Sequence, residues 1–504
     1  MRILTLLCAL AAAAPAALGQ LSADGIRIAT WNITFYDGGL EDELRTVLYG
    51  VFDGRAMMPD AIVVQEFQNR AAYDDFLAAI NSAPGSPGDW AASQFRDGTG
   101  FDTHLFFRVS KLVLTEVTVV SEGGPNPNHP RDPMRYDLRP WGYSDEAAGF
   151  SLYSVHFKAG SSPTDQSRRL VEARAIREDA AALPEGRGVI LAGDFNIQRA
   201  SQAAYQELIG TAPSSDPFDT GRFFDPISQI GDWQNNPSFR FVHTQDPAPG
   251  AAGMDDRYDQ LLVSEDLVDG ESLDYIGRFG IPYSNATWND PNHSYRAWGN
   301  DGSSYNQALR TVGNTMVGPD IAQAIRVAAN GAGHVPVYLD LRVPAVIDAP
   351  ATVDAGAVRP GQTIGVPIEH GGSINRWGID GIDTLRATAN SGPNIMPELG
   401  PFEIPAGQSV LVPVTVTSEP GELDAELHLA SNDPERPVIT VRIVGTVLEP
   451  CGADVNSDGV ADGSDFFAWV AAFGAQAPEC DVNSDGSCNG GDFFAWVAFF
   501  NKGC

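Results

Sequence analysis

Residues 189–198 read VILAGDFNIQ, an apolar stretch that ends in a carboxylate, Asp194, and an amide, Asn196, two positions apart. The apolar part is typical of a strand that is buried on both faces. Asp and Asn often begin turns, because their side chains bond to the nearby backbone. Whether this pair begins a turn or marks a functional site depends on what the ends of the other strands carry.

The length and charge of the chain limit the possible classes of protein. A chain of 504 residues is too long for one hydrophobic core, so about three domains are expected. The formal net charge of −33 argues against a protein that coats nucleic acid, because such proteins present basic surfaces. An enzyme that cleaves phosphodiesters is not excluded, since a bound metal ion can supply positive charge locally.

Residues 1–19 have the pattern of a cleaved secretory signal peptide. Arg2 precedes an apolar stretch, and the small residues Ala17 and Gly19 mark a cleavage site. No later stretch approaches the roughly 18 apolar residues that a transmembrane helix requires. We therefore expect an exported protein, secreted or attached to the cell surface, without a transmembrane segment.

Residues 20–344 alternate short apolar runs with helical stretches. Residues 167–183 place apolar residues at helical spacing and charged residues opposite, which predicts an amphipathic helix. This alternation predicts an α/β domain in which helices cover sheets. The apolar runs that we expect to form buried strands are residues 26–33, 60–67, 150–157, 188–197, 258–264 and 335–343.

The composition changes at about residue 345. Up to residue 449 the chain is rich in Val, Thr, Pro and Gly, and apolar residues alternate with period two in residues 408–418, 422–431 and 437–447. This pattern is typical of an all-β sandwich. The region resembles the Ig-like domains of exported bacterial proteins. Because no polar constellation is found in it, we expect it to have a spacer or presentation role.

Residues 450–504 contain an internal repeat, in which residues 454–473 return as residues 481–500. Oxygen-bearing side chains fall at loop positions 1, 3, 5, 9 and 12 of each copy, with a glycine at position 6, which is the spacing of a calcium loop. We therefore expect two bound Ca²⁺ ions. The predicted ligands are Asp454, Asn456, Asp458, Asp462 and Asp465, and then Asp481, Asn483, Asp485, Asn489 and Asp492.

A single helix is expected after each calcium loop, and position 12 is Asp rather than the longer Glu. Duplicates of this kind resemble dockerin type I modules, and the resemblance covers about 55 residues. It implies a small α-helical tail that docks onto a cohesin-like or cell-surface partner. The aromatic residues of the two FFAW motifs would form the core between the helices or part of the docking face.

Four cysteines lie in this tail, at Cys451, Cys480, Cys488 and Cys504. An even number in an exported segment indicates two disulfides, for which three pairings are possible. A structural zinc site is the alternative, although the spacing lacks a CxxC pair.

Polar residues also mark the ends of the other predicted strands in residues 20–344. Each of them alone has a structural explanation, such as a helix cap, a turn or a hydrogen-bonded core histidine. Together they would cost too much desolvation to be accidental, and ligands of α/β sheets gather where strands end. We therefore expect them to converge on one site. They are Asn32, Glu66, His156, Asp194, Asn196, Asp259 and His334.

The motifs TWNI, QE, SVHF, GDFN, RYDQLLVS and GHVPV occur in this order across residues 26–344. This ordered set resembles the endonuclease/exonuclease/phosphatase superfamily, which includes DNase I-like nucleases and neutral sphingomyelinases. The resemblance implies a four-layer sandwich of two β-sheets flanked by helices. It also implies a metal-dependent hydrolase of phosphoric esters.

The resemblance implies roles for the residues at the strand ends. Asn32 and Glu66 would hold Mg²⁺ or Mn²⁺, which prefer oxygen ligands. Asp194 would orient or deprotonate the attacking water, and Asn196 would hold the phosphate.

The histidines take the remaining roles. His334 would lie against the scissile phosphate with its tautomer fixed by Asp259, and His156 would donate to the developing negative charge. Arg139, which precedes a proline, resembles an arginine of the family, and Tyr136 is close to it in the sequence.

One position departs from the family pattern. The family usually has an aspartate directly before the last histidine, where this chain has Gly333. The loss of one oxygen ligand implies weaker metal affinity, a single-metal site or a protein that has lost activity. The other positions are intact, and water often completes Mg²⁺ sites, which favours an active enzyme.

We expect an exported, metal-dependent phosphodiesterase, with a nuclease as the leading candidate. A sphingomyelinase-like or phosphomonoester hydrolase of the same superfamily and an inactive surface-binding protein are the alternatives. Residues 121–140 are one candidate rim for the substrate. The long polar loop at residues 283–307 is another, and its aromatic residues are Trp288, Tyr295, Trp298 and Tyr305.

Overall fold

The computed structural model describes residues 24–211, 221–449 and 451–502, which divide into two compact units. The first unit extends to Pro344 and also includes Ser373–Asp383, and the second contains the remaining residues. The predicted signal peptide lies outside the described residues. Within the described ranges, no helix has the length and apolar character needed to cross a membrane.

The first unit contains two β-sheets. One has the strand order β10-β12-β1-β2-β4-β3, with β11 paired to β12, and the other has the order β5-β6-β7-β8-β9. The strands of the first sheet are β1 (Ile26–Tyr36), β2 (Ala61–Phe67), β3 (Trp90–Ala92), β4 (Asp102–Arg108), β10 (Asp274–Tyr275), β11 (Arg296–Ala297) and β12 (Val337–Arg342). Those of the second sheet are β5 (Leu112–Val119), β6 (Met134–Pro140), β7 (Phe150–His156), β8 (Gly188–Asp194) and β9 (Asp259–Val263).

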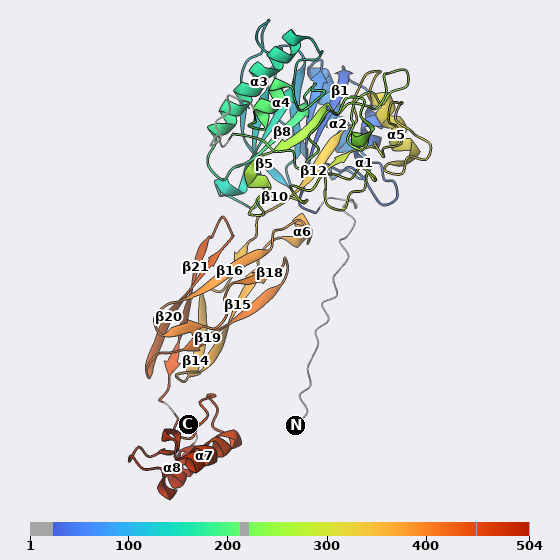
Figure 1. The fold of residues 1–504 in the computed structure, drawn as a ribbon. Helices are drawn as coiled ribbons and strands as arrows, with labels where there is room; N and C mark the ends of the chain where they lie inside the picture. Colours follow the sequence, from blue (N-terminus) through green and yellow to red (C-terminus); the bar gives the residue numbers. More distant parts are fainter. Residues whose placement is uncertain (1–23, 212–220, 450, 503–504) are drawn as a thin grey trace. The chain divides into compact units, whose positions relative to one another are not determined.

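Helices cover the outer faces of the two sheets, which pack against each other (Figure 1). Helices α1 (Glu41–Tyr49), α2 (Arg70–Ser82) and α5 (Gly318–Ala328) share an apolar core with β1 and β2. Helices α3 (Pro163–Ala181) and α4 (Ala203–Leu208) share another with β7 and β8. Short 3₁₀ turns occur at η1 (Glu146–Ala148), η2 (Pro237–Phe239) and η3 (Glu265–Leu267). The expected α/β arrangement of helix, sheet, sheet and helix layers is therefore present.

Helix α3 begins four residues before the predicted start at residue 167. The reason is a capping box, in which Ser162 and Asp165 satisfy each other's backbone N–H groups at the first turn. A proline at the first helical position, Pro163, also suits a helix start.

The strand that carries GVILAGD packs closely against its neighbour because of one glycine. Gly193 has a φ of +144°, and an added Cβ would lie 2.0 Å from the carbonyl oxygen of Val155. Any larger residue would push β7 and β8 apart. The glycine therefore brings the ends of these parallel strands together, with His156 beside Asp194.

The second unit begins with two β-sheets around one apolar core, which agrees with the β-rich region expected from the sequence. The sheet orders are β13-β15-β19-β17 and β14-β21-β20-β16-β18. The strands are β13 (Ile347–Asp348), β14 (Thr352–Val358), β15 (Thr363–His370), β16 (Leu385–Ser391), β17 (Ile395–Pro397), β18 (Phe402–Ile404), β19 (Ser409–Val416), β20 (Gly421–Ser431) and β21 (Val438–Val447).

The segment Ser373–Asp383, which contains α6 (Ile374–Trp377), also packs in the first unit, although it follows the expected boundary at residue 344. Trp377 is buried, and its backbone oxygen accepts a hydrogen bond from the backbone N–H of Gly25. The ammonium group of Lys111 lies 4.8 Å from the centre of the Trp377 ring. The first unit is therefore built from two separate stretches of the sequence.

The tail consists of α7 (Gly463–Ala475), η4 (Pro478–Cys480) and α8 (Gly490–Lys502). Trp469 and Trp496 occupy equivalent positions of the repeat, and both are buried in one small core. Cys480 and Cys488 form a disulfide, and Cys451 is also disulfide-bonded. Cys504 lies outside the described residues.

Candidate active site

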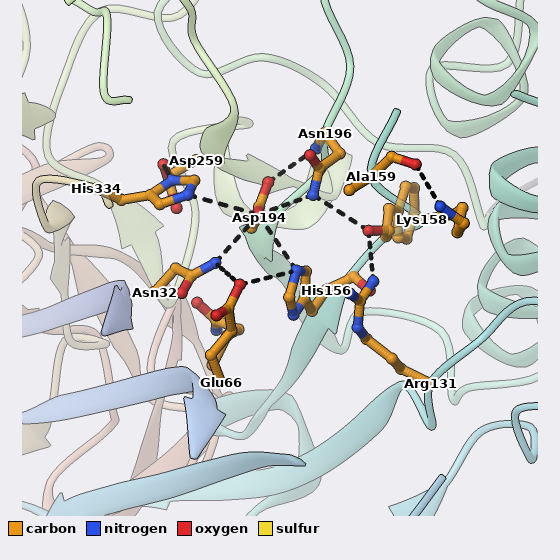
Figure 2. A network of polar contacts seen from close by, with 12 residues as sticks. Asn32, Glu66, Arg131, His156, Lys158, Ala159, Asp194, Asn196, Asp259 and His334 are labelled. Atoms are coloured by element: carbon orange, nitrogen blue, oxygen red, sulfur yellow. Dashed lines mark hydrogen bonds and ion pairs between the residues drawn. The ribbon is translucent and has the colours of Figure 1, made fainter. Parts of the chain in front are cut away.

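Asp194 lies at the centre of a buried polar cluster at the end of β8 (Figure 2). Its Oδ2 accepts hydrogen bonds from the side-chain amides of Asn196, at 2.8 Å, and Asn32, at 3.2 Å. The Nε2 atoms of His156 and His334 lie 3.4 Å and 3.8 Å from the same oxygen. The structure therefore brings together residues from within β1, from the ends of β7 and β8, and from the loops after β8 and before β12.

Glu66 joins the cluster because β2 is irregular at this residue. Its φ is +67°, and the pairing of β2 with both neighbouring strands shifts there. One carboxylate oxygen of Glu66 accepts a hydrogen bond from Asn32 at 3.1 Å and lies 3.5 Å from Nε2 of His156. The bulge thus directs this carboxylate to the side of Asp194 at which Asn32 and His156 lie.

His334 is held by a buried carboxylate and a backbone contact. Its Nδ1 lies 2.6 Å from Oδ2 of Asp259, and its carbonyl oxygen accepts a hydrogen bond from the indole of Trp31 at 3.1 Å. Asp259 is paired with Asp194 across β8 and β9. The Nδ1–H of His334 donates to Asp259, which leaves Nε2 directed towards Asp194.

The charges of the site are set by burial and by the neighbouring groups. Burial raises the pKa of Asp194 to about 6, although the nearby His334 opposes this rise. Burial alone lowers the pKa of His334, but the carboxylates of Asp259 and Asp194 more than offset it and raise the pKa to about 10. Burial, Arg131 and His334 hold the pKa of His156 well below its usual range. At neutral pH, His334 is therefore a cation and His156 is neutral.

The donor set fits a hard divalent cation. Asn32 Oδ1 is buried and has no hydrogen-bond partner among the residues that the structure describes. It belongs to the same cluster as the carboxylate of Glu66, whose second oxygen accepts a hydrogen bond from the backbone N–H of Phe35 at 3.0 Å. Mg²⁺ and Mn²⁺ bind to one or two carboxylates and amide oxygens and retain water. Asn32 and Glu66 would hold such an ion.

The structure places Arg139 and Tyr136 outside the cluster. In the antiparallel pair of β6 and β7, Leu138 lies opposite Phe150, at the end of β7 that is remote from His156. The guanidinium of Arg139 donates to the backbone oxygen of Ser144, and the hydroxyl of Tyr136 donates to that of Thr103. The sequence-based assignment of Arg139 is not supported, because Arg139 lies at the end of β6 that is remote from His156.

Arg131 is the arginine that the structure places at the site. It donates to the backbone oxygens of His156 and Phe157, at 3.1 Å and 2.9 Å. Burial lowers its pKa, whereas the charges of Asp194, Glu172 and Glu66 act to raise it. Arg131 lies in the loop before β6, and no strand pattern indicates its position. It falls within residues 121–140, the candidate rim, but nothing in HPRDP singled out Arg131 itself.

Gly333 cannot be replaced by the family's aspartate without displacing the backbone. A Cβ at this position would lie 2.1 Å from the carbonyl oxygen of Ala329 and 2.4 Å from its Cα. The turn that follows α5 is therefore packed in a way that excludes a side chain. The packing of this turn therefore explains why the chain has glycine, and no carboxylate, at position 333.

The long loop at residues 283–307 is mainly a structural element. Tyr295 and Trp298 are almost completely buried, and the Trp298 indole donates to the backbone oxygen of Val47. Trp288 is partly buried and donates to the side chain of Thr315. These aromatic rings fasten the loop to the domain, so they do not form a free surface for stacking.

The two predicted calcium loops have matching hydrogen-bond patterns. Asp454 accepts from the backbone N–H groups of Asp458 and Gly459, and Asp481 accepts from those of Asp485 and Gly486. In the first loop, carboxylate oxygens of Asp454, Asp458 and Asp465 lie within 4.8 Å of one another. This acidic triad could hold an ion. The other predicted ligands lie in the same loops or at the first turns of α7 and α8.

Comparison with known proteins agrees with this geometry. The model of the Endonuclease/Exonuclease/phosphatase family matches residues 29–279, a range that includes the six site residues from Asn32 to Asp259 and ends before His334. No curated protein matches.

Several solved structures are similar at low identity. The human Nocturnin catalytic domain with bound sulfate is 13% identical, with a TM-score of 0.37 over 64% of this chain and 95% of that chain. D. rerio TDP2 in complex with a single-strand DNA product is 14% identical, with a TM-score of 0.36 over 63% and 99%. Beta toxin from Staphylococcus aureus is 11% identical, with a TM-score of 0.34 over 62% and 99%. The family match shows that residues 29–279 form a phosphoesterase domain of the endonuclease/exonuclease/phosphatase family.

Proposed function

We propose that the first unit is a metal-dependent phosphodiesterase that hydrolyses its substrate with an activated water. One observation carries this proposal: the buried Asp194 carboxylate lies 3.8 Å from Nε2 of His334, which Asp259 orients at 2.6 Å. A base and a cation held together in this way can act on one phosphate and its attacking water.

Each side chain has a role that follows from its protonation state. Asp194, whose pKa is about 6, is a carboxylate at neutral pH and takes the proton of the attacking water. His334, cationic at the same pH, donates its Nε2–H to a phosphoryl oxygen. The bond from phosphorus to the leaving oxygen then breaks as the new bond from the water forms. The leaving oxygen takes a proton from solvent.

The remaining residues of the cluster position these groups. The neutral His156 carries its proton on Nε2, which faces Glu66 and Asp194, and can donate to the phosphate. The side-chain amide of Asn196 donates to Asp194 and to the backbone oxygen of Phe157, and it would bind the same phosphate by exchanging one of these bonds. A divalent cation at Asn32 and Glu66 would neutralise negative charge on the phosphoryl oxygens.

Nucleic acid is our leading proposal for the substrate, which would make the protein a nuclease. Sphingomyelinase-like and phosphomonoester hydrolysis are the alternatives within the family, and a binding protein without activity is the alternative outside it. Gly333 is the only feature that favours lost activity. The other predicted site residues apart from Arg139 lie together, which supports an active enzyme.

We further propose that the protein is exported and that its tail binds two Ca²⁺ ions and docks onto a cohesin-like or cell-surface partner. The matching loops support calcium binding. Phe467 and Phe494, which occupy equivalent positions of the repeat, are 72% and 74% exposed, which supports a docking face on α7 and α8. Calorimetric titration of the full chain with Ca²⁺ would test this proposal. Two sites are expected, and Asp454→Asn should remove one of them.

The activity is tested with the full chain and three substrates: a DNA oligonucleotide, sphingomyelin and a phosphomonoester. We expect Mg²⁺ or Mn²⁺ to support hydrolysis of the oligonucleotide and EDTA to abolish it. Asp194→Asn should lower kcat by about 10²- to 10⁴-fold, the usual effect of losing a general base. Asp424→Asn, at an exposed position of the second unit, is the matched control. Absence of turnover of every substrate with either metal would contradict the proposal.

A further inference from the structure

Phe35 is an exposed aromatic residue directly beside the candidate metal ligand Glu66. Its backbone N–H donates to the carboxylate of Glu66 at 3.0 Å, while its side chain is 51% exposed. Its φ is +51°, a conformation that is uncommon for a bulky residue. Strained backbone of this kind clusters at binding and catalytic sites, where the surrounding structure maintains it. The strand thus holds an apolar ring in solvent at the edge of the site.

Phe101 connects this ring to the catalytic cluster. The rings of Phe35 and Phe101 meet edge to face, with centres 5.3 Å apart and an interplanar angle of 69°. The Phe101 ring is nearly parallel to His156, at 6.2 Å and 17°, and the guanidinium of Arg131 lies 5.6 Å from its centre. Because Phe101 already lies against His156 and Arg131, Phe35 is the ring of this pair that is exposed to solvent. We call Phe35 and Phe101 the aromatic ledge.

We propose that the aromatic ledge binds an unpaired nucleobase of the substrate by stacking on Phe35, an inference that rests on the proposed phosphodiesterase function. The ledge lies beside Glu66 and His156, so a nucleotide whose phosphate reaches the cluster brings its base to the ledge. Stacking on an aromatic side chain is tolerant of base identity, because every base has a π-face. Bases in a duplex are already stacked and are not available for this contact.

The surroundings of the ledge favour a base over the acyl chains of a lipid. Asp37, two residues after Phe35, is exposed, and so is Asp97 in the loop before Phe101. Insertion of Phe35 into a membrane would bring these carboxylates to the lipid surface and desolvate them. A nucleobase needs only one face of one ring. The ledge therefore selects single-stranded nucleic acid or an unpaired end.

The test compares an oligothymidylate with an abasic phosphodiester polymer of equal length, using the full chain with Mg²⁺. We expect wild-type protein to favour the oligothymidylate in kcat/KM by about 5- to 150-fold, the range that one base–aromatic stack produces. Phe35→Ala should bring this ratio close to one, and Phe35→Trp should retain it. Phe279→Ala is the matched control, since Phe279 is 43% exposed and meets Phe224 edge to face at 5.5 Å.

The possible outcomes distinguish a failure of the stacking proposal from a failure of the proposed function. If both polymers are hydrolysed and Phe35→Ala keeps the wild-type ratio of kcat/KM values, the stacking proposal is overturned and the proposed phosphodiesterase function is retained. If wild-type protein hydrolyses neither polymer, the proposal that it is a nuclease fails, and binding of the same polymers by fluorescence anisotropy then tests the stacking proposal. Preferential binding of the oligothymidylate that Phe35→Ala abolishes would support the ledge. Equal binding of the two polymers would overturn it.

Discussion

Nδ1 of His334 lies 2.6 Å from Oδ2 of Asp259, although 75 residues separate them in the chain, and both side chains are almost completely buried. An ion pair in such a place strongly favours the charged imidazole. It also fixes the tautomer of His334, so that Nε2 is directed towards Asp194. This contact links the electrostatics of the site to the stability of the fold.

The first prediction concerns pH and the stability of the metal-free protein. The pKa of His334 is about 10 in the folded state and 6.5 in its usual range, so its contribution to stability is complete below pH 6.5. This contribution is lost as the pH rises from 6.5 to about 10. Asp259→Asn removes the main partner of His334 and should flatten this part of the profile. Urea unfolding in EDTA at several pH values would measure it, and parallel profiles for the two proteins would contradict the prediction.

The two arginines of the β6 region should behave differently on substitution. Arg131→Met removes a cation that bonds to the backbone beside His156, so we expect kcat to fall by roughly 10-fold or more, as for a lost charge-assisted hydrogen bond of about 1.5–3 kcal/mol. Arg139→Met should leave kcat unchanged, because Arg139 lies at the remote end of the strand. Steady-state hydrolysis by both variants is the measurement. Equal losses would show that the site extends further than the structure indicates.

Restoring the aspartate that is usual in the family should harm this protein. Gly333→Asp would place a Cβ 2.1 Å from the carbonyl oxygen of Ala329, so we expect a loss of about 1–3 kcal/mol in the free energy of unfolding and no gain in activity. Gly400→Asp is the control, because a Cβ there meets no atom within 4 Å. A stable and more active Gly333→Asp protein would mean that the turn after α5 adapts easily.

The segment Ser373–Asp383 should stabilise the first unit. Trp377 is 2% exposed, and its truncation to alanine should lower the unfolding free energy by about 3–5 kcal/mol. Phe279→Ala is the comparison, because Phe279 is 43% exposed and should cost less than about 1 kcal/mol. Guanidinium unfolding of the full chain would show the difference. If the two variants unfold alike, residues up to 344 are sufficient for the unit.

The sequence predicted the strands and the residues at their ends well, for a physical reason. One polar side chain at a buried strand has several explanations, but a set of them has a high total desolvation cost, and this cost identifies the set without any knowledge of the fold. Asn32, Asp194 and His334 were found in this way. The order of the motifs, which resembles that of the family, predicted the fold of the first unit.

Other features depend on tertiary structure, and the sequence did not single out the residues concerned. Arg131 lies in a loop, and only the folded chain brings it to the carbonyl oxygens of His156 and Phe157. The positive φ values of Phe35 and Glu66 arise where β1 and β2 change register. The first unit ends at Pro344, the boundary expected from the sequence, but the sequence did not indicate that the later segment Ser373–Asp383 returns to this unit.

The most direct test of the central claim is the kcat/KM for hydrolysis of a DNA oligonucleotide by the full chain, measured with Mg²⁺ and with EDTA. The account predicts metal-dependent hydrolysis that falls by about 10²- to 10⁴-fold in His334→Ala. It also predicts that His428→Ala, an exposed histidine of the second unit, retains wild-type activity. Hydrolysis that persists undiminished in His334→Ala, or that EDTA leaves unchanged, would contradict the account.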